Sequence, residues 1–305
     1  MLISLYSSEL PTPSFQARTG MANLPTYITI LTLLFLVAFM LSIGMETTHG
    51  QILATLRNER RLVWLSLLAN FILVPLLGFI LSRLFQFSSD VAAGFLLLTV
   101  APGGLFALNF SRVSKGNLVY AIGLVFVLSL LSVIITPALA NLLFTPVVTA
   151  RVPIFKAIGF LLLVVLLPIS AGRAIQYWSQ PVARVLGKLM GTLSIVLFIT
   201  VTLLTSKLKS PAIAALGLKG LTAIILLVVA CWVIGWLLGG PQLENRKVLA
   251  IGTSMRNVAI CLPIALSYFP STNVLVPIVA FSGISITMNM VFGLIMGRLN
   301  RSMGA

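Results

Sequence analysis

Acidic residues are scarce in this chain of 305 residues, where five aspartates and glutamates stand against 20 lysines and arginines. Charged residues make up 8% of the sequence, whereas a soluble domain carries roughly 25%. So few charges cannot cover a surface that faces water, which excludes a soluble enzyme and a disordered chain. The net charge of +15 does not indicate a nucleic-acid-binding protein either, because the basic residues are scattered between long apolar runs.

Histidine and cysteine, which supply much of the metal and redox chemistry of proteins, are almost absent. Cys231 and Cys261 lie in apolar runs without metal-ligand spacing, and the single histidine, His49, follows the first apolar run. The sequence also lacks a glycine-rich phosphate loop and a nucleophile triad, so we expect no enzyme activity, no cofactor and no metal site. No carboxylate lies in the middle of an apolar run, where it could carry a proton across a membrane.

Apolar residues make up 59% of the chain. A helix needs roughly 20 mostly apolar residues to cross a bilayer core, so these runs predict an all-α polytopic membrane protein with about nine transmembrane helices. A membrane strand would instead alternate over about 9–11 residues. Residues 1–24 are expected to form a polar extension without a signal peptide, with translation starting at Met1 or Met21. The predicted spans are residues 25–45, 62–84, 91–114, 117–143, 153–176, 187–206, 217–238, 245–269 and 272–296.

The distribution of basic residues predicts the orientation in the membrane. With the N-terminus outside, twelve lysines and arginines fall in the inner segments and seven in the outer segments, and only Arg256 lies in neither. Because inner segments carry the excess of positive charge, this bias favours an outer N-terminus and an inner C-terminus. We expect a multi-pass protein of a bacterial inner membrane.

Two of the spans contain sequences that break a helix. The third span contains Pro102-Gly103-Gly104, and the eighth contains the run from Gly252 to Asn257. Each break lies about 15 Å into its span, near the bilayer midplane. Because the two spans run in opposite directions, the pattern indicates an inverted-repeat transporter whose hinges are Pro102, Gly103, Gly104 and Gly252. The predicted repeats are residues 25–143 and 153–297.

The half-helices that start after the breaks direct their N–H groups toward the midplane, which favours an anion there. We therefore expect a secondary transporter that moves an organic anion by alternating access. A simple kink at Pro102 and a helix contact at Gly252 are the structural alternatives for the two breaks. A channel or a sensor with a transporter fold remains open as a different class, and saturable counterflow distinguishes a carrier from both.

The order and spacing of several motifs resemble the bile acid/sodium symporter family over roughly residues 25–297. The resemblance implies a panel domain, formed by spans 1, 5 and 6, that moves against a core domain formed by spans 2–4 and 7–9. It also implies transport of organic anions such as bile acids or small carboxylates, often driven by sodium. The motifs are Gly44-Met45, Asn70 before Val74-Pro75-Leu76, Pro102-Gly103-Gly104, Gly116-Asn117, Thr136-Pro137 and the run from Thr253 to Asn257.

The chain departs from this resemblance at the positions of the sodium ligands. For the second sodium site, the resemblance points to Asn70 and Arg256, and a guanidinium donates hydrogen bonds but accepts none. For the first site it points to five residues without a side-chain oxygen. These are Ala107, Leu108, Ala121, Val125 and Gly252. We therefore expect sodium coupling to be weakened or lost. The alternative is a conventional sodium symporter that binds its ions through Asn70, Asn109, Met255 and backbone carbonyls.

Arg256 is the most informative residue, because a lone arginine near the midplane is costly and no acid lies three or four residues away. It could bind helix carbonyls or reach an interface. It could also bind a substrate carboxylate directly, or replace sodium as a fixed charge. We expect the lipid bilayer and a small organic anion as partners, no nucleic acid, and a monomer or weak homo-oligomer. The candidate substrate ligands are Arg256, Asn109, Asn257, Thr253, Ser254 and Asn289.

Overall fold

The computed structural model describes residues 24–104, 106–144, 152–208, 214, 216–269 and 272–302. Over these residues the regular structure is helical, and the one feature of β type is an isolated bridge between Pro102 and Arg256. The predicted all-α class is therefore confirmed. Residues 1–23 of the predicted polar extension lie outside the described residues, and the first helix within the described part begins at Leu24.

Seven helices of the described residues are long and apolar enough to cross a membrane. Each coincides within a few residues with one of the unbroken predicted spans. The exception is the helix of the sixth predicted span, which begins seven residues earlier than predicted, at Gln180. Two of the seven contain a short π-helical turn, η2 (Ala69–Leu73) and η3 (Leu162–Leu166). The seven are α2 (Leu24–Glu46), α4 (Arg60–Leu68) with η2 and α5 (Val74–Leu84), α8 (Leu118–Phe144), α9 (Ile154–Leu161) with η3 and α10 (Leu167–Trp178), α11 (Gln180–Leu208), α13 (Gly217–Leu238) and α16 (Leu275–Ser302).

The two spans that were predicted to be broken each form a pair of half-helices. The first pair is α6 (Ser89–Val100) and α7 (Ala107–Val113), and the second is α14 (Leu243–Ser254) and α15 (Val258–Tyr268). Gly252 lies inside α14 and not in the break, which corrects its assignment as a hinge. That each pair crosses the bilayer as one span, giving nine in total, stays a prediction.

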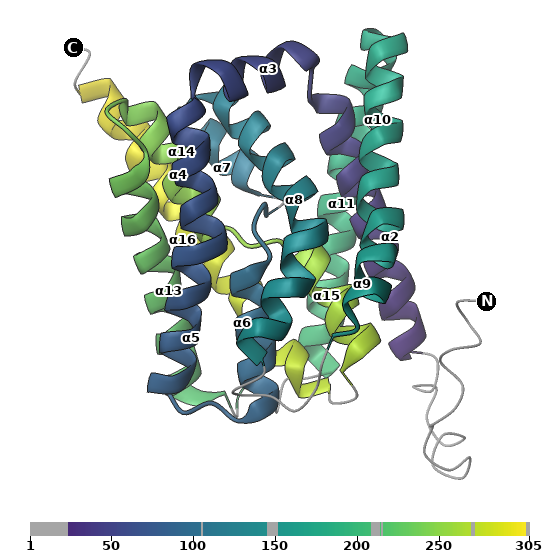
Figure 1. Cartoon of the computed structure of the whole chain (residues 1–305), viewed down its shortest axis with the longest axis vertical. Helices are drawn as coiled ribbons and strands as arrows, with labels where there is room; N and C mark the ends of the chain where they lie inside the picture. The colour runs from purple at the N-terminus through teal and green to yellow at the C-terminus, as the bar shows by residue number, and fades with distance from the viewer. Residues whose placement is uncertain are drawn as a thin grey trace.

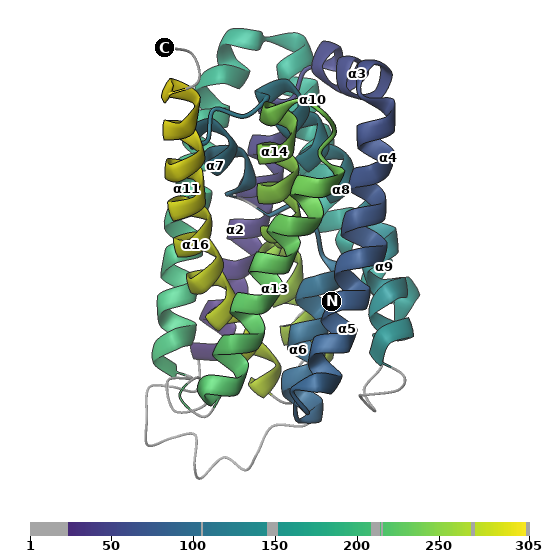
Figure 2. The same ribbon diagram turned by 90° about the vertical axis from the view of Figure 1, so that its left-hand side faces the viewer.

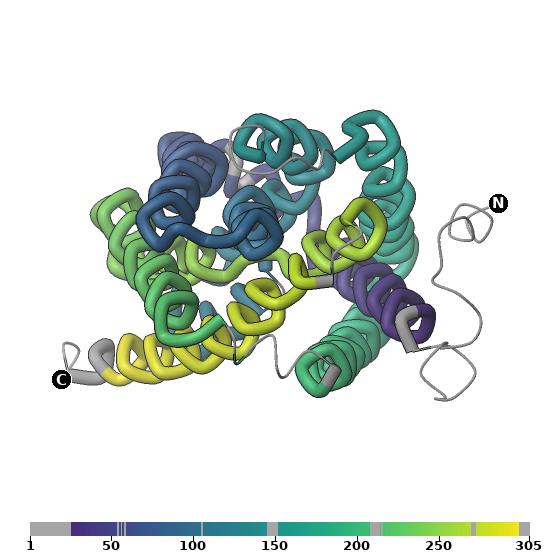
Figure 3. Tube along the Cα trace, turned by 90° about the horizontal axis from the view of Figure 1, so that it is seen from below, coloured from purple at the N-terminus to yellow at the C-terminus, as the bar shows by residue number. Residues whose placement is uncertain are grey.

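The helices form two groups that lie side by side (Figures 1 and 3). In the smaller group α2 packs mainly against α10 and α11. In the larger group α13 packs against α14, α16 and α5, as Figure 2 shows from the side. These groups contain the spans that the family resemblance assigns to a panel and to a core, and we use those two names for them. Their relative movement stays a prediction.

One end of the molecule carries α3 (His49–Asn58) and, near it, the C-terminal ends of α10 and α16 (Figure 1). A capping box starts α3: the Thr48 hydroxyl accepts from the Gln51 N–H, and the Gln51 side chain accepts from the Thr48 N–H. The basic connector between the first two predicted spans therefore lies across this end of the bundle. We call it the α3 end.

Candidate functional site at the helix crossing

The two breaks meet and hydrogen-bond to each other as short extended segments, and we call this meeting point the helix crossing. The Asn257 N–H donates to the Ala101 carbonyl at 2.7 Å, and the Gly104 N–H donates to the Met255 carbonyl at 3.3 Å. Backbone groups at bilayer depth need such partners, because no water replaces them there. The pairing fixes the position of α6, α7, α14 and α15 relative to one another.

Glycines allow the breaks to approach so closely. Gly103 has a φ of +89°, a backbone angle that residues other than glycine rarely adopt. A Cβ atom on Gly104 would lie 2.7 Å from the Arg256 carbonyl oxygen. The Pro-Gly-Gly sequence therefore does more than stop a helix: it lets a second chain segment lie against the backbone.

The carbonyl groups at the C-terminal end of α6 point at the side chain of Arg256. The Arg256 Nε donates to the Leu98 carbonyl at 3.0 Å, and Nη2 donates to the Thr99 carbonyl at 2.5 Å. The next carbonyl, of Val100, accepts from the Thr136 hydroxyl at 2.7 Å. Helix C-termini leave such carbonyls unpaired and carry partial negative charge, so they attract a cation.

Asn70, in the η2 turn, supplies two further acceptors to the same guanidinium. Its side-chain Oδ1 accepts from Nη1 of Arg256 at 2.8 Å, and its backbone carbonyl accepts from Nη2 at 3.4 Å. That carbonyl is free because the π turn bonds the Val74 N–H to Ala69, while Pro75, next in order, has no N–H. Asn70 therefore offers a cation two oxygen atoms, one from its side chain and one from its backbone carbonyl.

Arg256 uses all five of its N–H donors in this site. The fifth bond runs from Nη1 to the Thr253 carbonyl at 3.2 Å, near the end of α14. The side chain is 2% exposed, and its five acceptors are neutral carbonyl and amide oxygens. The positive charge is therefore stabilised by the ends of two half-helices and by Asn70, without an acidic partner in this set.

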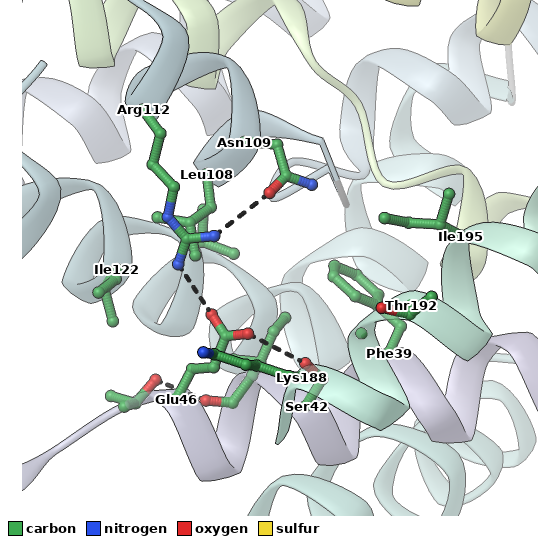
Figure 4. A pocket seen from close by; sticks show the side chains of 14 residues that line it. Phe39, Ser42, Glu46, Leu108, Asn109, Arg112, Ile122, Lys188, Thr192 and Ile195 are labelled. Carbon is green, nitrogen blue, oxygen red and sulfur yellow. Dashed lines mark hydrogen bonds and ion pairs between the residues drawn. The ribbon is translucent and has the colours of Figure 1, made fainter. Parts of the chain in front are cut away.

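A cavity of about 280 Å³ lies toward the α3 end, between the panel and the core. Its panel wall comes from α2 and α11 and its core wall from α7 and α8. A second cavity of about 320 Å³ adjoins it and shares Glu46, Arg112, Ile122 and Lys188. We call the two together the vestibule; Figure 4 shows its first part.

Aromatic rings fill the space between the vestibule and Arg256. The ring of Phe198 on α11 lies 5.4 Å from that of Phe35 on α2 and 5.4 Å from that of Phe106, next to α7. These three rings line a pocket of only about 10 Å³ beside Arg256. The panel and core are thus in close contact at the level of the helix crossing and apart at the level of the vestibule.

Comparison with known proteins places the chain in a transporter family. The model of the sodium bile acid symporter family matches residues 33–234. The chain belongs to this family.

The relatives found for this member of the sodium bile acid symporter family are distant and longer. A probable sodium/metabolite cotransporter BASS3 of Oryza sativa chloroplasts is 26% identical over 73% of this chain and 51% of its own length. The corresponding BASS1 protein of Arabidopsis thaliana is 24% identical over 81% of this chain and 61% of its own length. The human P3 protein is 24% identical over 70% of this chain and 46% of its own length. The chain thus spans about half of each relative.

The residues that the family resemblance assigns to a first sodium site have apolar surroundings. Ala107 and Val125 belong to a buried cluster with Ile251 and Met255, and Ala121 packs in a neighbouring apolar cluster. Leu108 and Val125 also line the vestibule. These surroundings offer carbon atoms where a sodium ion needs oxygen ligands.

Three of the predicted substrate ligands lie in the interior of the bundle and hydrogen-bond within it. Thr253, Ser254 and Asn289 are fully buried. The Thr253 hydroxyl donates to the Leu249 carbonyl within α14, while Ser254 donates to Asn289 Oδ1 at 2.7 Å.

Two other predicted ligands, Asn109 and Asn257, lie at different depths in the bundle. Asn109 on α7 is partly exposed and lines the vestibule. Asn257 is buried at the start of α15, and neither atom of its side-chain amide has a hydrogen-bond partner among the described residues. Met255, predicted as an ion ligand, offers its carbonyl to Gly104 instead.

Sequence analysis missed the charged lining of the vestibule. Glu46, Arg112 and Lys188 come from three different helices, at the ends of predicted spans. The only sequence signal was their place in the basic inner segments, which indicates orientation and not a site.

Proposed function

We propose that this chain is a secondary transporter of a small organic anion in which Arg256 takes the place of one sodium ion. The observation that carries the proposal is the set of five oxygen atoms around the guanidinium. Carbonyl and amide oxygens at helix ends are the ligands that a hard cation such as sodium prefers. A tethered cation neutralises them permanently and leaves no volume for a mobile ion.

Of the two functional roles that the sequence left open for Arg256, this geometry favours the fixed charge. A substrate carboxylate could reach the guanidinium only by displacing it from these oxygen atoms, and buried carbonyl groups that lose a hydrogen bond are costly. The unpartnered amide of Asn257, at the N-terminal end of α15, is the better candidate for contact with the anion. The α15 dipole favours a negative charge at that end.

Transport then proceeds by rocking of the panel against the core around the helix crossing. Without sodium, the driving force is exchange of one anion for another or the anion gradient itself. A conventional sodium symporter is the second candidate. The names of the chloroplast relatives, probable sodium/metabolite cotransporters, favour it. In that case Asn70, Asn109 and backbone carbonyls hold the ion.

Replacement of Arg256 by glutamine separates the two candidates. The Arg256→Gln side chain removes the charge and offers an oxygen, so the oxygen cluster should bind a sodium ion again. We expect the melting temperature of purified Arg256→Gln protein to fall in choline buffer and to recover in part when sodium is added, by mass action. The wild type should melt at the same temperature in both buffers, as should the surface control Arg298→Gln.

Transport is measured in parallel in proteoliposomes with a panel of small carboxylates. We expect uptake and counterflow by the wild type to be equal with sodium and with choline. Sodium-dependent uptake or melting of the wild type would overturn the tethered-cation proposal and support the conventional symporter.

A further inference from the structure

We propose that the vestibule holds an entry site for organic anions, in which the carboxylate of the substrate replaces Glu46 as the partner of Arg112. The site is separate from the helix crossing and from Arg256. It rests on the proposed function only in taking an organic anion as the transported species, and its electrostatic part is testable without a substrate.

Arg112 is weakly held in the structure. Its Nη2 lies 3.4 Å from Oε2 of Glu46, and its Nη1 lies 3.4 Å from Oδ1 of Asn109 (Figure 4). The other carboxylate oxygen of Glu46 accepts from Ser42 at 3.5 Å. The side chains of Arg112 and Glu46 are 48% and 27% exposed. Long, solvent-exposed bonds of this kind contribute little and are readily exchanged for a better-placed anion.

The charge of the vestibule favours an anionic guest. Glu46 is the one acid among the described residues that line it, against Arg112, Lys188 and Arg184. The lining therefore carries more positive than negative charge even with the Arg112–Glu46 pair formed. The exposed hydroxyl group of Thr192 adds a donor beside the same space.

The shape of the site matches a small carboxylate. The two cavities of about 280 and 320 Å³ each have a volume close to the lower limit of small-molecule sites, which is roughly 300 Å³. A guanidinium binds a free carboxylate through two parallel bonds, whereas Glu46 reaches only one of its nitrogens. A substrate can thus form a stronger pair with Arg112 than Glu46 does.

The pair also connects the two helix groups. Glu46 is the last residue of α2 in the panel, and Arg112 lies on α7 in the core. An anion that binds Arg112 therefore breaks a contact between panel and core at the α3 end. Binding of the substrate and separation of the panel from the core at this end are therefore coupled.

The test uses a cysteine in place of the exposed Thr192, which lines the vestibule. The native Cys231 and Cys261 are 1% and 0% exposed, so they should not react and the unmodified chain is the blank. The probes are the anionic reagent methanethiosulfonate ethylsulfonate and its cationic trimethylammonium counterpart. The measured quantity is the ratio of their reaction rates, divided by the ratio for a free thiol.

We expect the anionic reagent to react faster with Thr192→Cys by about fivefold or more, the effect of nearby unit charges in a wet cavity. Adding Glu46→Gln should raise the ratio by about threefold, and adding Arg112→Gln should lower it by about as much. Arg298→Gln, a surface change on α16, should leave it unchanged. If neither Glu46→Gln nor Arg112→Gln changes the ratio, the proposal of a charged site is wrong.

Competition by pyruvate, used as a plain carboxylate probe, tests the exchange itself. Pyruvate should slow the reaction of Thr192→Cys with the anionic reagent. The added change Glu46→Gln should lower the pyruvate concentration needed by about threefold. The added change Arg112→Gln should abolish the protection by pyruvate, and Arg112→Lys should retain part of it. If Glu46→Gln weakens protection, the glutamate is a ligand and not a competitor, and the proposal fails. These results do not depend on Arg256, so failure of the sodium proposal remains a separate outcome.

Discussion

At the residue scale, the protein solves the problem of a lone arginine in an apolar bundle with neutral oxygens. The sequence identified Arg256 because no acid stands near it along the helix. It could not supply the partners, since Leu98 and Asn70 lie 158 and 186 positions away. Which carbonyls are free depends on where α6 ends and on the π turn before Pro75, and hydrophobic patterning does not encode either feature.

The Asn70 side chain is expected to stabilise the buried charge measurably. Asn70→Ala removes the acceptor at 2.8 Å from Nη1 and leaves that N–H unpaired. Hydrogen bonds to charged groups contribute about 1.5–3 kcal/mol, so the free energy of unfolding should fall by about that amount. Thermal unfolding of the purified protein measures it, with Thr287→Ala as the control because that hydroxyl is exposed. Equal melting of Asn70→Ala and wild type would contradict the described geometry.

At the element scale, the helices and the two breaks followed from the sequence, but the second break was predicted to start at Gly252, three residues too early. Polar and small residues from Gly252 onward indicate a break, yet α14 continues to Ser254, and the hydroxyls of Thr253 and Ser254 donate to carbonyls within α14. The first break was placed correctly because Pro102, Gly103 and Gly104 exclude a regular helix by their own geometry.

The close approach of the two breaks predicts that Gly104 tolerates no side chain. In Gly104→Ala the new Cβ meets the Arg256 carbonyl oxygen at 2.7 Å, and the surrounding backbone must move. We expect a loss of about 1–3 kcal/mol in stability, with a lower melting temperature. Gly283→Ala is the matched control, because its Cβ meets no atom within 4 Å and alanine favours the helix. A similar response of the two variants would argue against the bridge.

At the scale of the whole molecule, α2, α10 and α11 pack as one group, and the division into a moving panel and a core stays a prediction. That division came from the family resemblance, because contacts between helices distant in sequence leave no periodic pattern. The same holds for the vestibule, whose charged residues come from three helices. Composition predicted a membrane protein, and only the fold shows where its few charges meet.

The orientation predicted from the basic residues can be measured with two single cysteines at opposite ends of the bundle. Gly50→Cys lies on α3, where no atom would crowd the side chain, and Ser88→Cys lies in the exposed turn between α5 and α6. The excess of lysine and arginine belongs on the inner side, so the α3 end should face the cytoplasm. In intact cells a membrane-impermeant maleimide should then label Ser88→Cys at once and Gly50→Cys only after permeabilisation, while the buried native cysteines stay unlabelled. The opposite result would place the vestibule on the outer face, and Arg112 would then meet anions that arrive from outside the cell.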